Sequence, residues 1–395
     1  MKVLNICNLY TIAFFIFNFL GGLGSDLLIS KFLLVFILFV GIIYSCIVLI
    51  KYKMPIIFKG VNVFFLLLIV YGLINILLNK TYYVSTFFTY RKVPSYYFLL
   101  KSLLSFLPLY TYYYFSIKKY ISVRWIKICF IFLLVSATSS YIMDFQKQFI
   151  EDLQGSDGYT LNASYSFLFL LPYLYFFKSK PLLQFSLLGY LSLLILLGMK
   201  RGAILIFIIC LLLFLYHIQK SFSSFAKLRL YVIIIIFISI IGYQTIELYN
   251  NNVYFLERVQ ATIDGNSSGR DVIYSNLFNH FAKSGFHYLL LGHGGYSTLP
   301  IHGQYAHQDW LELAIDCGIL GLFSYSLFYL KFLKNIKAIK HNIVRNILLQ
   351  CFLILFLKSL FSMGYENIGQ ELGILISFCV STDRLYKHSK EEIVI

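Results

Sequence analysis

The chain has 395 residues, of which 59% are apolar and only 13% are charged, whereas soluble domains usually carry about a quarter charged residues. This composition excludes an ordinary soluble domain and indicates a membrane protein. The formal net charge of +16 would suggest nucleic-acid binding in a soluble protein, but in a membrane protein it first reports topology. We therefore expect the chain to be embedded in a lipid bilayer and not to bind nucleic acid. The seven cysteines lie in apolar stretches without metal-binding spacing, so they predict neither a disulfide framework nor a zinc site.

Apolar windows of roughly membrane-spanning length follow one another along the chain. Twelve of them are apparent, at about 5–23, 27–50, 59–78, 96–115, 125–143, 161–177, 182–198, 201–216, 229–249, 309–330, 346–363 and 368–382. The predicted organisation is therefore nine spans within residues 1–249, a long external loop at 250–308, and three further spans followed by a cytoplasmic C-terminus within 309–395.

The distribution of basic residues predicts the orientation. With the N-terminus in the cytoplasm, 21 lysines and arginines lie inside, nine lie outside and three fall within spans, which satisfies the positive-inside rule. Both termini are then cytoplasmic. In the external loop, Ile273, Leu277 and Phe281 recur at helical spacing within Arg270 to Ser284, and this pattern predicts an amphipathic helix at the membrane surface.

Some basic residues lie in predicted external segments, where the positive-inside rule disfavours them, and are therefore candidates for anion binding. Lys200 and Arg201 occupy a very short external turn, where a guanidinium could bind a phosphate or diphosphate, or could instead contact lipid headgroups. Arg270 has the same two readings, as a phosphate ligand or as a solvated charge at a helix end. For Arg91, beside Lys92, contact with lipid phosphates is favoured over a share in the same site.

The start of the tenth predicted span carries the clearest candidate for proton transfer. If this segment is helical from its first residues, His307, Trp310 and Leu311 share one face, which places an imidazole at the mouth of a span. The alternative is a structural histidine. Asp309 and Glu312 could orient the imidazole or bind sugar hydroxyls, or they could be carboxylates that favour a helix start. His302 and Tyr305 are candidate sugar contacts.

Two ionisable residues are predicted to lie inside the membrane. Asp316 falls in the tenth span and Lys358 in the eleventh, at similar depths of roughly 8 to 10 Å. Because an ionisable residue in a membrane needs a partner, we expect these two side chains to form a buried structural pair.

Several short motifs occur in a recognisable order. They are Arg201-Gly202-Ala203, Gly269-Arg270, Gly292-His293-Gly294, His307-x-x-Trp310-Leu311-Glu312 and Gly318-x-x-Gly321. In this order they resemble the O-antigen ligase and polymerase superfamily. The chain departs from the family pattern at Gln308, where asparagine is common, and in lacking a proline before the glycine-rich turn.

The resemblance implies an all-α polytopic protein with the GT-C-type glycosyltransferase fold in a bacterial inner membrane. It implies an undecaprenyl-diphosphate-linked oligosaccharide as donor and acceptor, a periplasmic active site, no cofactor or metal, and a chain-length regulator as a partner. Arg201 and Arg270 would bind the diphosphate, with Lys200 and Arg91 nearby, and His307 would act as the base. A polymerase is the leading reading, because the motif around His307 resembles the polymerase form. A ligase that transfers the glycan to lipid A core is the alternative, and a transporter of lipid-linked glycans is a further one.

Overall fold

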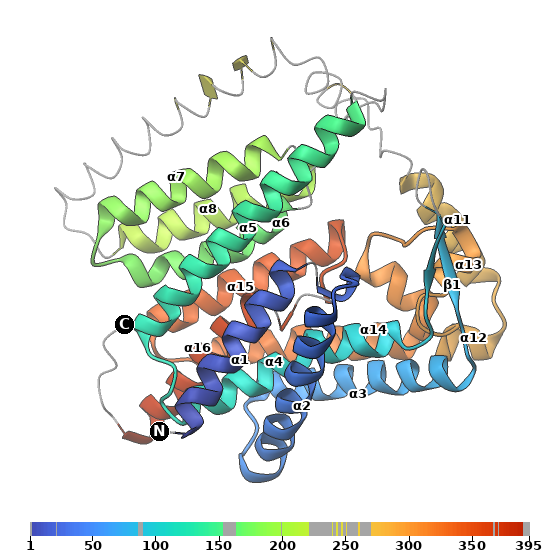
Figure 1. Cartoon of the computed structure of the whole chain (residues 1–395), viewed down its shortest axis with the longest axis horizontal. Helices are drawn as coiled ribbons and strands as arrows, with labels where there is room; N and C mark the ends of the chain where they lie inside the picture. The colour runs from blue at the N-terminus through green and yellow to red at the C-terminus, as the bar shows by residue number, and fades with distance from the viewer. Residues whose placement is uncertain are drawn as a thin grey trace. The chain divides into compact units, whose positions relative to one another are not determined.

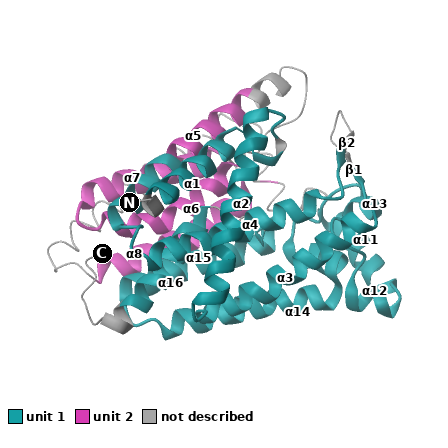
Figure 2. Cartoon of the chain, turned by 60° about the horizontal axis from the view of Figure 1, so that its bottom comes forward, with its two compact units in different colours: residues 1–133, 270–395 teal, residues 134–269 magenta. Residues whose placement is uncertain are grey.

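The computed structural model describes residues 2–20, 22–85, 90–152, 163–198, 200–220, 270–365, 368–369 and 371–389, with a few isolated residues between 239 and 260. Helices dominate these residues (Figure 1). The chain divides into two compact units, one formed by Met1–Leu133 with Arg270–Ile395 and the other by Leu134–Gly269 (Figure 2). Each unit is described by itself.

The first unit brings together the two ends of the chain. Its long helices are α1 (Lys2–Phe19), α2 (Leu28–Lys51), α3 (Ile56–Leu77), α4 (Tyr97–Ile117), the start of α5 (Val123–Asp152), α14 (Asp309–Ala338), α15 (Asn342–Phe361) and α16 (Glu371–Ser389). Its short elements are η1 (Gly22–Gly24), β1 (Tyr82–Ser85), β2 (Tyr90–Val93), α11 (Arg270–Lys283), α12 (Phe286–Leu291) and α13 (Thr298–His302).

The second unit contains the rest of α5 and a group of apolar helices. These are α6 (Ala163–Leu170), the 3-10 helix η2 (Leu171–Phe177), α7 (Pro181–Leu197) and α8 (Arg201–Gln219). Proline suits the first position of α7, because its missing N–H would have no partner inside the helix. The side chain of Gln184 is buried and its Nε2 donates to the carbonyl of Leu174 at 2.8 Å, which ties α7 to η2.

The predicted apolar windows coincide with helices wherever the structure describes them. Within the described residues, six helices are long and apolar enough to cross a membrane, in α2, α3, α5, α8, α14 and α15, and shorter apolar helices occupy Asn5–Phe19, Ala163–Phe177 and Pro181–Leu197. The window at 229–249 falls almost entirely outside the described residues. The polytopic helical architecture is confirmed, whereas the count of twelve spans and the GT-C fold stay predictions.

A small β-sheet is the element that the prediction of an all-α chain missed. Strands β1 and β2 pair in an antiparallel register that places Tyr82 opposite Val93 and Ser85 opposite Tyr90. Tyrosine and valine favour extended structure, but each strand has only four residues. Such short strands between two spans give no periodic signal of useful length.

Helix α14 is held against α3 by a close approach of the two main chains. A Cβ atom at Gly60 would lie 2.9 Å from the Cα atom of Phe328, so glycine permits this contact. Beside it, the ring of Phe64 lies 4.8 Å from that of Tyr325. Helices α16 and α4 are also in contact, and the Ser377 hydroxyl of α16 donates to the carbonyl of Leu109 in α4 at 2.6 Å.

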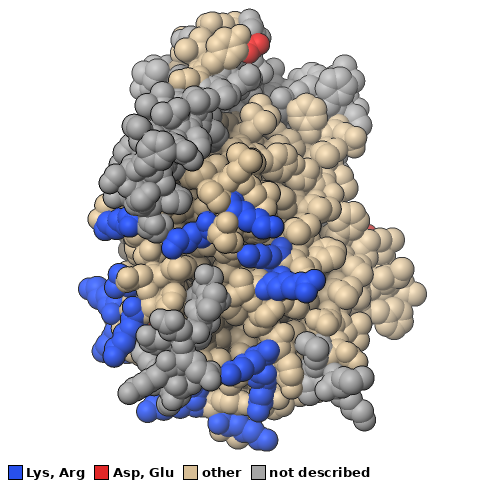
Figure 3. All heavy atoms as spheres, turned by 90° about the vertical axis from the view of Figure 1, so that its left-hand side faces the viewer, with Lys and Arg blue, Asp and Glu red and all other residues tan. Residues whose placement is uncertain are grey.

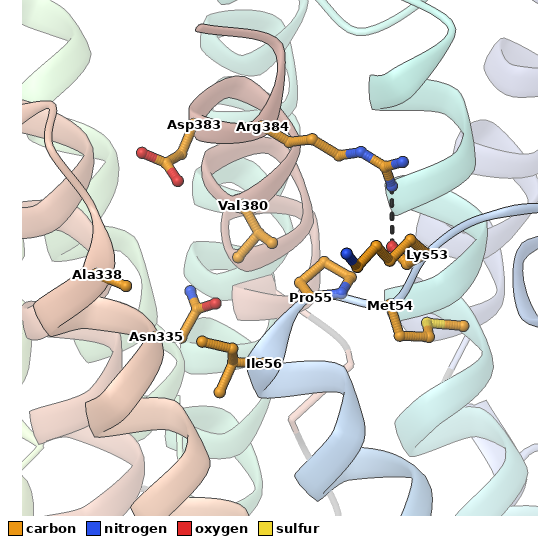
Figure 4. Close-up of a pocket in the computed structure, with 9 residues that line it drawn as sticks. All are labelled: Lys53, Met54, Pro55, Ile56, Asn335, Ala338, Val380, Asp383 and Arg384. Atoms are coloured by element: carbon orange, nitrogen blue, oxygen red, sulfur yellow. Dashed lines mark hydrogen bonds between the residues drawn. The ribbon is translucent and has the colours of Figure 1, made fainter. Parts of the chain in front are cut away.

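Basic residues gather at the end of this unit where α1 begins and α16 ends (Figures 1 and 3). Around Tyr52, after α2, the guanidinium of Arg384 lies 5.9 Å from the ring centre and Lys118 forms a hydrogen bond to the hydroxyl. A small pocket of about 240 Å³ opens here, and Arg384 crosses it to donate to the carbonyl of Lys53 at 3.0 Å (Figure 4). This concentration of cations at one end agrees with the predicted cytoplasmic side, while the orientation itself stays a prediction.

Candidate active site at the start of α14

Three buried carboxylates lie on one face of the first half of α14. Asp309, Glu312 and Asp316 follow one another at spacings of three and four residues, which places them in one row on a helix. All three are fully buried. A buried carboxylate is stable only when hydrogen bonds or charges satisfy its oxygens, so the partners of this carboxylate row define what the segment holds in place.

Asp316 binds the main chain of the loop that follows α12. Its two oxygens accept from the backbone N–H groups of Tyr296 and Ser297, each at 2.8 Å. The hydroxyl of Ser297 donates in turn to the carbonyl of Gly294 at 2.6 Å. The carboxylate therefore fixes the shape of the turn that leads into α13.

Glu312 joins the two ends of the segment that contains α13. One oxygen accepts from the hydroxyl of Thr298, the first residue of α13, at 2.6 Å, and the other accepts from the backbone N–H of Ala306 at 2.7 Å. The side chain of Glu312 thus connects the two ends of the segment 298–306 and closes it into a loop. The closure ends one residue before His307.

Asp309 binds the chain that leaves α15. It accepts from the backbone N–H groups of Gly364 at 2.8 Å and Tyr365 at 3.0 Å, and from the hydroxyl of Tyr325 at 2.5 Å. The neighbouring indole of Trp310 donates to the hydroxyl of Ser359 at 3.1 Å. The start of α14 is therefore fixed to the end of α15 by side chains of two successive residues.

The glycine-rich turn predicted around residue 293 packs into a kink in α14. Gly318 has φ of 63° within the helix, a conformation that disrupts the regular helical hydrogen bonds. The carbonyl groups of Ile315 and Asp316 instead accept from the backbone N–H groups of His293 at 2.8 Å and Gly294 at 2.9 Å. A Cβ atom at Gly318 would lie 2.6 Å from the nitrogen of Gly292, so this contact between main chains requires glycine.

The C-terminal end of α3 and the residues just after it hold the other side of the same turn. The hydroxyl of Tyr71 donates to the carbonyl of Leu291, Asn75 Nδ2 donates to the carbonyl of Gly295 at 3.0 Å, and Lys80 Nζ donates to the carbonyl of His293 at 2.5 Å. These three residues were not predicted as part of the site. Asn75, a buried polar residue in an apolar window, and Lys80 just beyond it were the available signals.

His307 lies at the surface between two anchored neighbours. Its side chain is exposed and its backbone has φ of 55°, a conformation that is uncommon for residues other than glycine. Helix α14 begins only at Asp309, after an extended residue at Gln308. The predicted helical face shared by His307, Trp310 and Leu311 is therefore wrong: the imidazole precedes the helix, while Leu311 packs towards α11.

Helix α11 confirms the amphipathic helix predicted in the loop. Ile273 and Leu277 are buried in one cluster with Ala306, and Phe281 packs against it. Arg270, the first residue of α11, donates from Nη1 to the carbonyl of Phe361 at 3.0 Å. Arg270 and Asp309 therefore hold the same segment, 361–365, so the structure brings Arg270 to the region that anchors the start of α14.

The other predicted site residues have varied outcomes. Lys200 caps α8 and Arg201 begins it, and both belong to the second unit, so their joint action with Arg270 stays a prediction. Arg91 pairs with Val84 in the β-sheet, and its side chain falls outside the described residues. His302 is half-buried, with Nδ1 at 3.5 Å from Asn276 Nδ2.

Asp316 and Lys358 are both buried, as predicted, and both form hydrogen bonds to the main chain, while their predicted pairing with each other stays a prediction. Asp316 accepts from the two backbone N–H groups described above, and Lys358 donates from Nζ to the carbonyl of Met363. Asp309 and Glu312 likewise have main-chain and hydroxyl partners, and sugar binding by these two carboxylates stays a prediction.

Two cavities open beside this framework within the first unit. One, of about 620 Å³, is lined by Lys80, His280, Tyr288 and His293 among others. Burial lowers the pKa of His293, and the nearby His280 and Lys80 lower it further. The other, of about 690 Å³, includes Tyr305 in its wall. Among the described residues, no group of three or more histidine, cysteine, aspartate or glutamate side chains is arranged to hold a metal ion.

Comparison with known families identifies the segment that contains the site. Residues 186–326, about a third of the chain, match the family model described as O-antigen ligase. The matched region includes Arg201, Arg270, His307 and the carboxylate row. No curated protein is significantly similar to the chain. The match agrees with the resemblance to the O-antigen ligase and polymerase superfamily that the order of the motifs indicated.

Proposed function

We propose that the chain is a surface-polysaccharide polymerase. It transfers a growing glycan from undecaprenyl diphosphate to the next lipid-linked repeat unit at the periplasmic face of the inner membrane. The observation that carries this proposal is the placement of His307, which is exposed and follows a residue whose amide is held by Glu312. It lies within the segment that matches the O-antigen ligase family.

The proposed reaction is a single displacement at the anomeric carbon of the donor. The acceptor hydroxyl oxygen forms a bond to this carbon while the bond from carbon to diphosphate oxygen breaks. The hydroxyl proton passes to the neutral imidazole of His307, since histidine is the side chain that most often acts as a general base. The bonding electrons leave with undecaprenyl diphosphate, so the negative charge that must be stabilised grows on the diphosphate.

Arginine side chains supply that stabilisation in the proposal. A guanidinium carries five N–H donors and binds phosphate through two of them at once. The bond from Arg270 Nη1 to the carbonyl of Phe361 orients the side chain and leaves further donors for a phosphate. Arg201 is proposed as the second guanidinium, with Lys200 beside it, since fixed cations placed where charge develops lower the barrier most.

The acceptor distinguishes the candidate activities. The sequence His307-x-Asp309-Trp310-Leu311-Glu312 resembles the polymerase form of the motif and favours a lipid-linked repeat unit as acceptor. The description of the matching family as O-antigen ligase favours the second candidate, transfer to lipid A core. A chain-length regulator is a proposed partner of the polymerase.

The test is transfer by the purified protein with lipid-linked repeat units alone, with the products resolved on a gel. A ladder of oligomers is expected from the wild type and from two controls, His287→Ala in the same loop and Arg345→Ala in α15, both exposed. His307→Ala and Arg270→Ala should abolish the ladder while retaining the wild-type elution volume. A single transfer that requires lipid A core would identify a ligase, and the absence of transfer with either acceptor would contradict the proposal.

A further inference from the structure

Three lysines line the cavity of about 690 Å³ in the first unit. Lys31 comes from α2, Lys92 from β2 and Lys101 from α4. One carboxylate, Asp26, shares the wall with them. The lining therefore carries an excess of two positive charges, which favours an anionic occupant.

Two of these lysines lie near the start of apolar helices. Lys31 is the fourth residue of α2 and Lys101 the fifth residue of α4. On the predicted topology this is the external side, where lysine is disfavoured. Cations that line one cavity raise the electrostatic potential inside it, which favours an anionic ligand.

The depth of the lysines distinguishes a lipid headgroup from distal sugars. At about 1.5 Å per residue, both side chains begin within roughly 8 Å of the first residue of their helices. Lipid phosphates lie at this level, whereas the outer sugars of a long glycan extend into water. The wall also includes Phe17, Leu34 and Leu100, which provide an apolar surface for the first units of a lipid tail.

The same cavity is connected to the segment that carries His307. Tyr305, two residues earlier, forms part of its wall. The ring of Tyr305 lies 5.5 Å from that of Tyr296, which in turn lies 6.3 Å from the ring of Tyr97, another residue of the wall. Because Asp316 holds the amide of Tyr296, the carboxylate row supports both the cavity wall and the segment of the proposed base.

We propose that the three-lysine cavity binds the phosphate-bearing headgroup of the acceptor lipid, separately from the donor diphosphate at Arg270. This inference rests on the proposed function, in which donor and acceptor are both lipid diphosphates. One cation cluster cannot serve both headgroups at once, so the reaction needs two anion sites. A ligase needs the same pair of sites, because lipid A core is also a phosphorylated lipid.

The test measures how many lipid diphosphates bind. Native mass spectrometry of the purified full chain with farnesyl diphosphate should give two bound molecules for the wild type. Lys31→Gln/Lys92→Gln should weaken the second binding event by at least about tenfold, as loss of charged hydrogen bonds implies. The matched control Lys337→Gln/Lys340→Gln removes two exposed lysines at the other end of α14 and should still bind two molecules.

Competition identifies the kind of anion. Inorganic pyrophosphate should displace the second molecule weakly, because it lacks a tail, and phosphatidylglycerol should displace it poorly, because it carries one phosphodiester. Equal displacement by phosphatidylglycerol would show a site for bulk lipid and overturn the proposal. Unchanged binding of two molecules by the Lys31→Gln/Lys92→Gln variant would also overturn it.

The transfer assay separates this proposal from the proposed function. If the double variant loses the second molecule and also raises the KM for acceptor with little change in kcat, the cavity is the acceptor site. If the wild type forms no product while the second site is still lost in the variant, the proposed function is wrong and the anion site stands. If product forms with an unchanged KM in the variant, the cavity has no role in acceptor binding.

Discussion

Replacing carboxylates of α14 by amides should separate two kinds of hydrogen-bond partner. Asp316 accepts hydrogen bonds from two backbone N–H groups, those of Tyr296 and Ser297, which lose their charged acceptor in Asp316→Asn. The amide oxygen keeps one of them, but the amide NH₂ cannot accept from the other. A buried N–H is then left without an acceptor, and with the loss of a charged hydrogen bond this costs about 2 to 3 kcal/mol.

The matched change Glu312→Gln should cost much less, because one partner of Glu312 can reverse its role. The amide oxygen still accepts from the N–H of Ala306. The amide NH₂ donates to the hydroxyl oxygen of Thr298, which both donates and accepts. Both contacts survive, and only the charge on the acceptor is lost, which costs about 1 kcal/mol.

Hydrogen exchange followed by mass spectrometry measures the difference where it arises. At about 1.36 kcal/mol per factor of ten, Asp316→Asn should accelerate exchange in the peptide that contains Tyr296 and Ser297 by about 30- to 160-fold. Glu312→Gln should accelerate exchange around Ala306 by about fivefold. Equal acceleration in the two variants, or none in Asp316→Asn, would refute the assignment of these carboxylates as anchors for main-chain amides.

Three further outcomes follow from the same framework. Gly318→Ala should destabilise the loop, since a Cβ there meets Gly292 at 2.6 Å and φ is positive; retained wild-type thermal stability would contradict the docked turn. Trp310→Phe should lower stability by about 1 kcal/mol, as the bond from Nε1 to Ser359 is lost, and denaturant titration would detect it. Burial and neighbouring cations lower the pKa of His293, so the unfolded chain binds a proton more readily and stability should fall as pH drops below about 6.5. His293→Gln should flatten this dependence between pH 7.5 and 5.5, and an unchanged slope in thermal unfolding would show that another group is responsible.

The spans could be predicted because their signal is local. A window of about 20 apolar residues bounded by charge reflects the thickness of the bilayer, and every window in the described residues contains a helix. The amphipathic helix α11 was predictable for the same reason, since Ile273 and Leu277 recur at helical spacing and are buried.

The site itself depends on contacts between distant segments, which no local pattern contains. The start of α14 at Asp309 and the left-handed backbone of His307 follow from hydrogen bonds to residues 364–365 and from closure of the loop by Glu312. Helical spacing counted from His307 therefore gave a face that does not exist. The burial of Asp316 could be inferred from depth, but depth does not reveal that the main-chain amides of Tyr296 and Ser297 reach the same position.

Polar residues at the edge of a membrane span are usually interpreted as functional. Here they fall into two groups, buried carboxylates whose oxygens accept hydrogen bonds from the protein and an exposed histidine. The buried carboxylates of α14 accept hydrogen bonds from main-chain amides and hydroxyls, and they shape three separate segments. His307 is exposed, and its neighbours are fixed by Glu312 and Asp309. The hydrogen bonds of the buried carboxylates thus stabilise the unfavourable backbone conformation of His307, whose imidazole is exposed. The base that we propose at His307 would then need no reorganisation when substrate binds, and rigid placement of this kind contributes to catalysis.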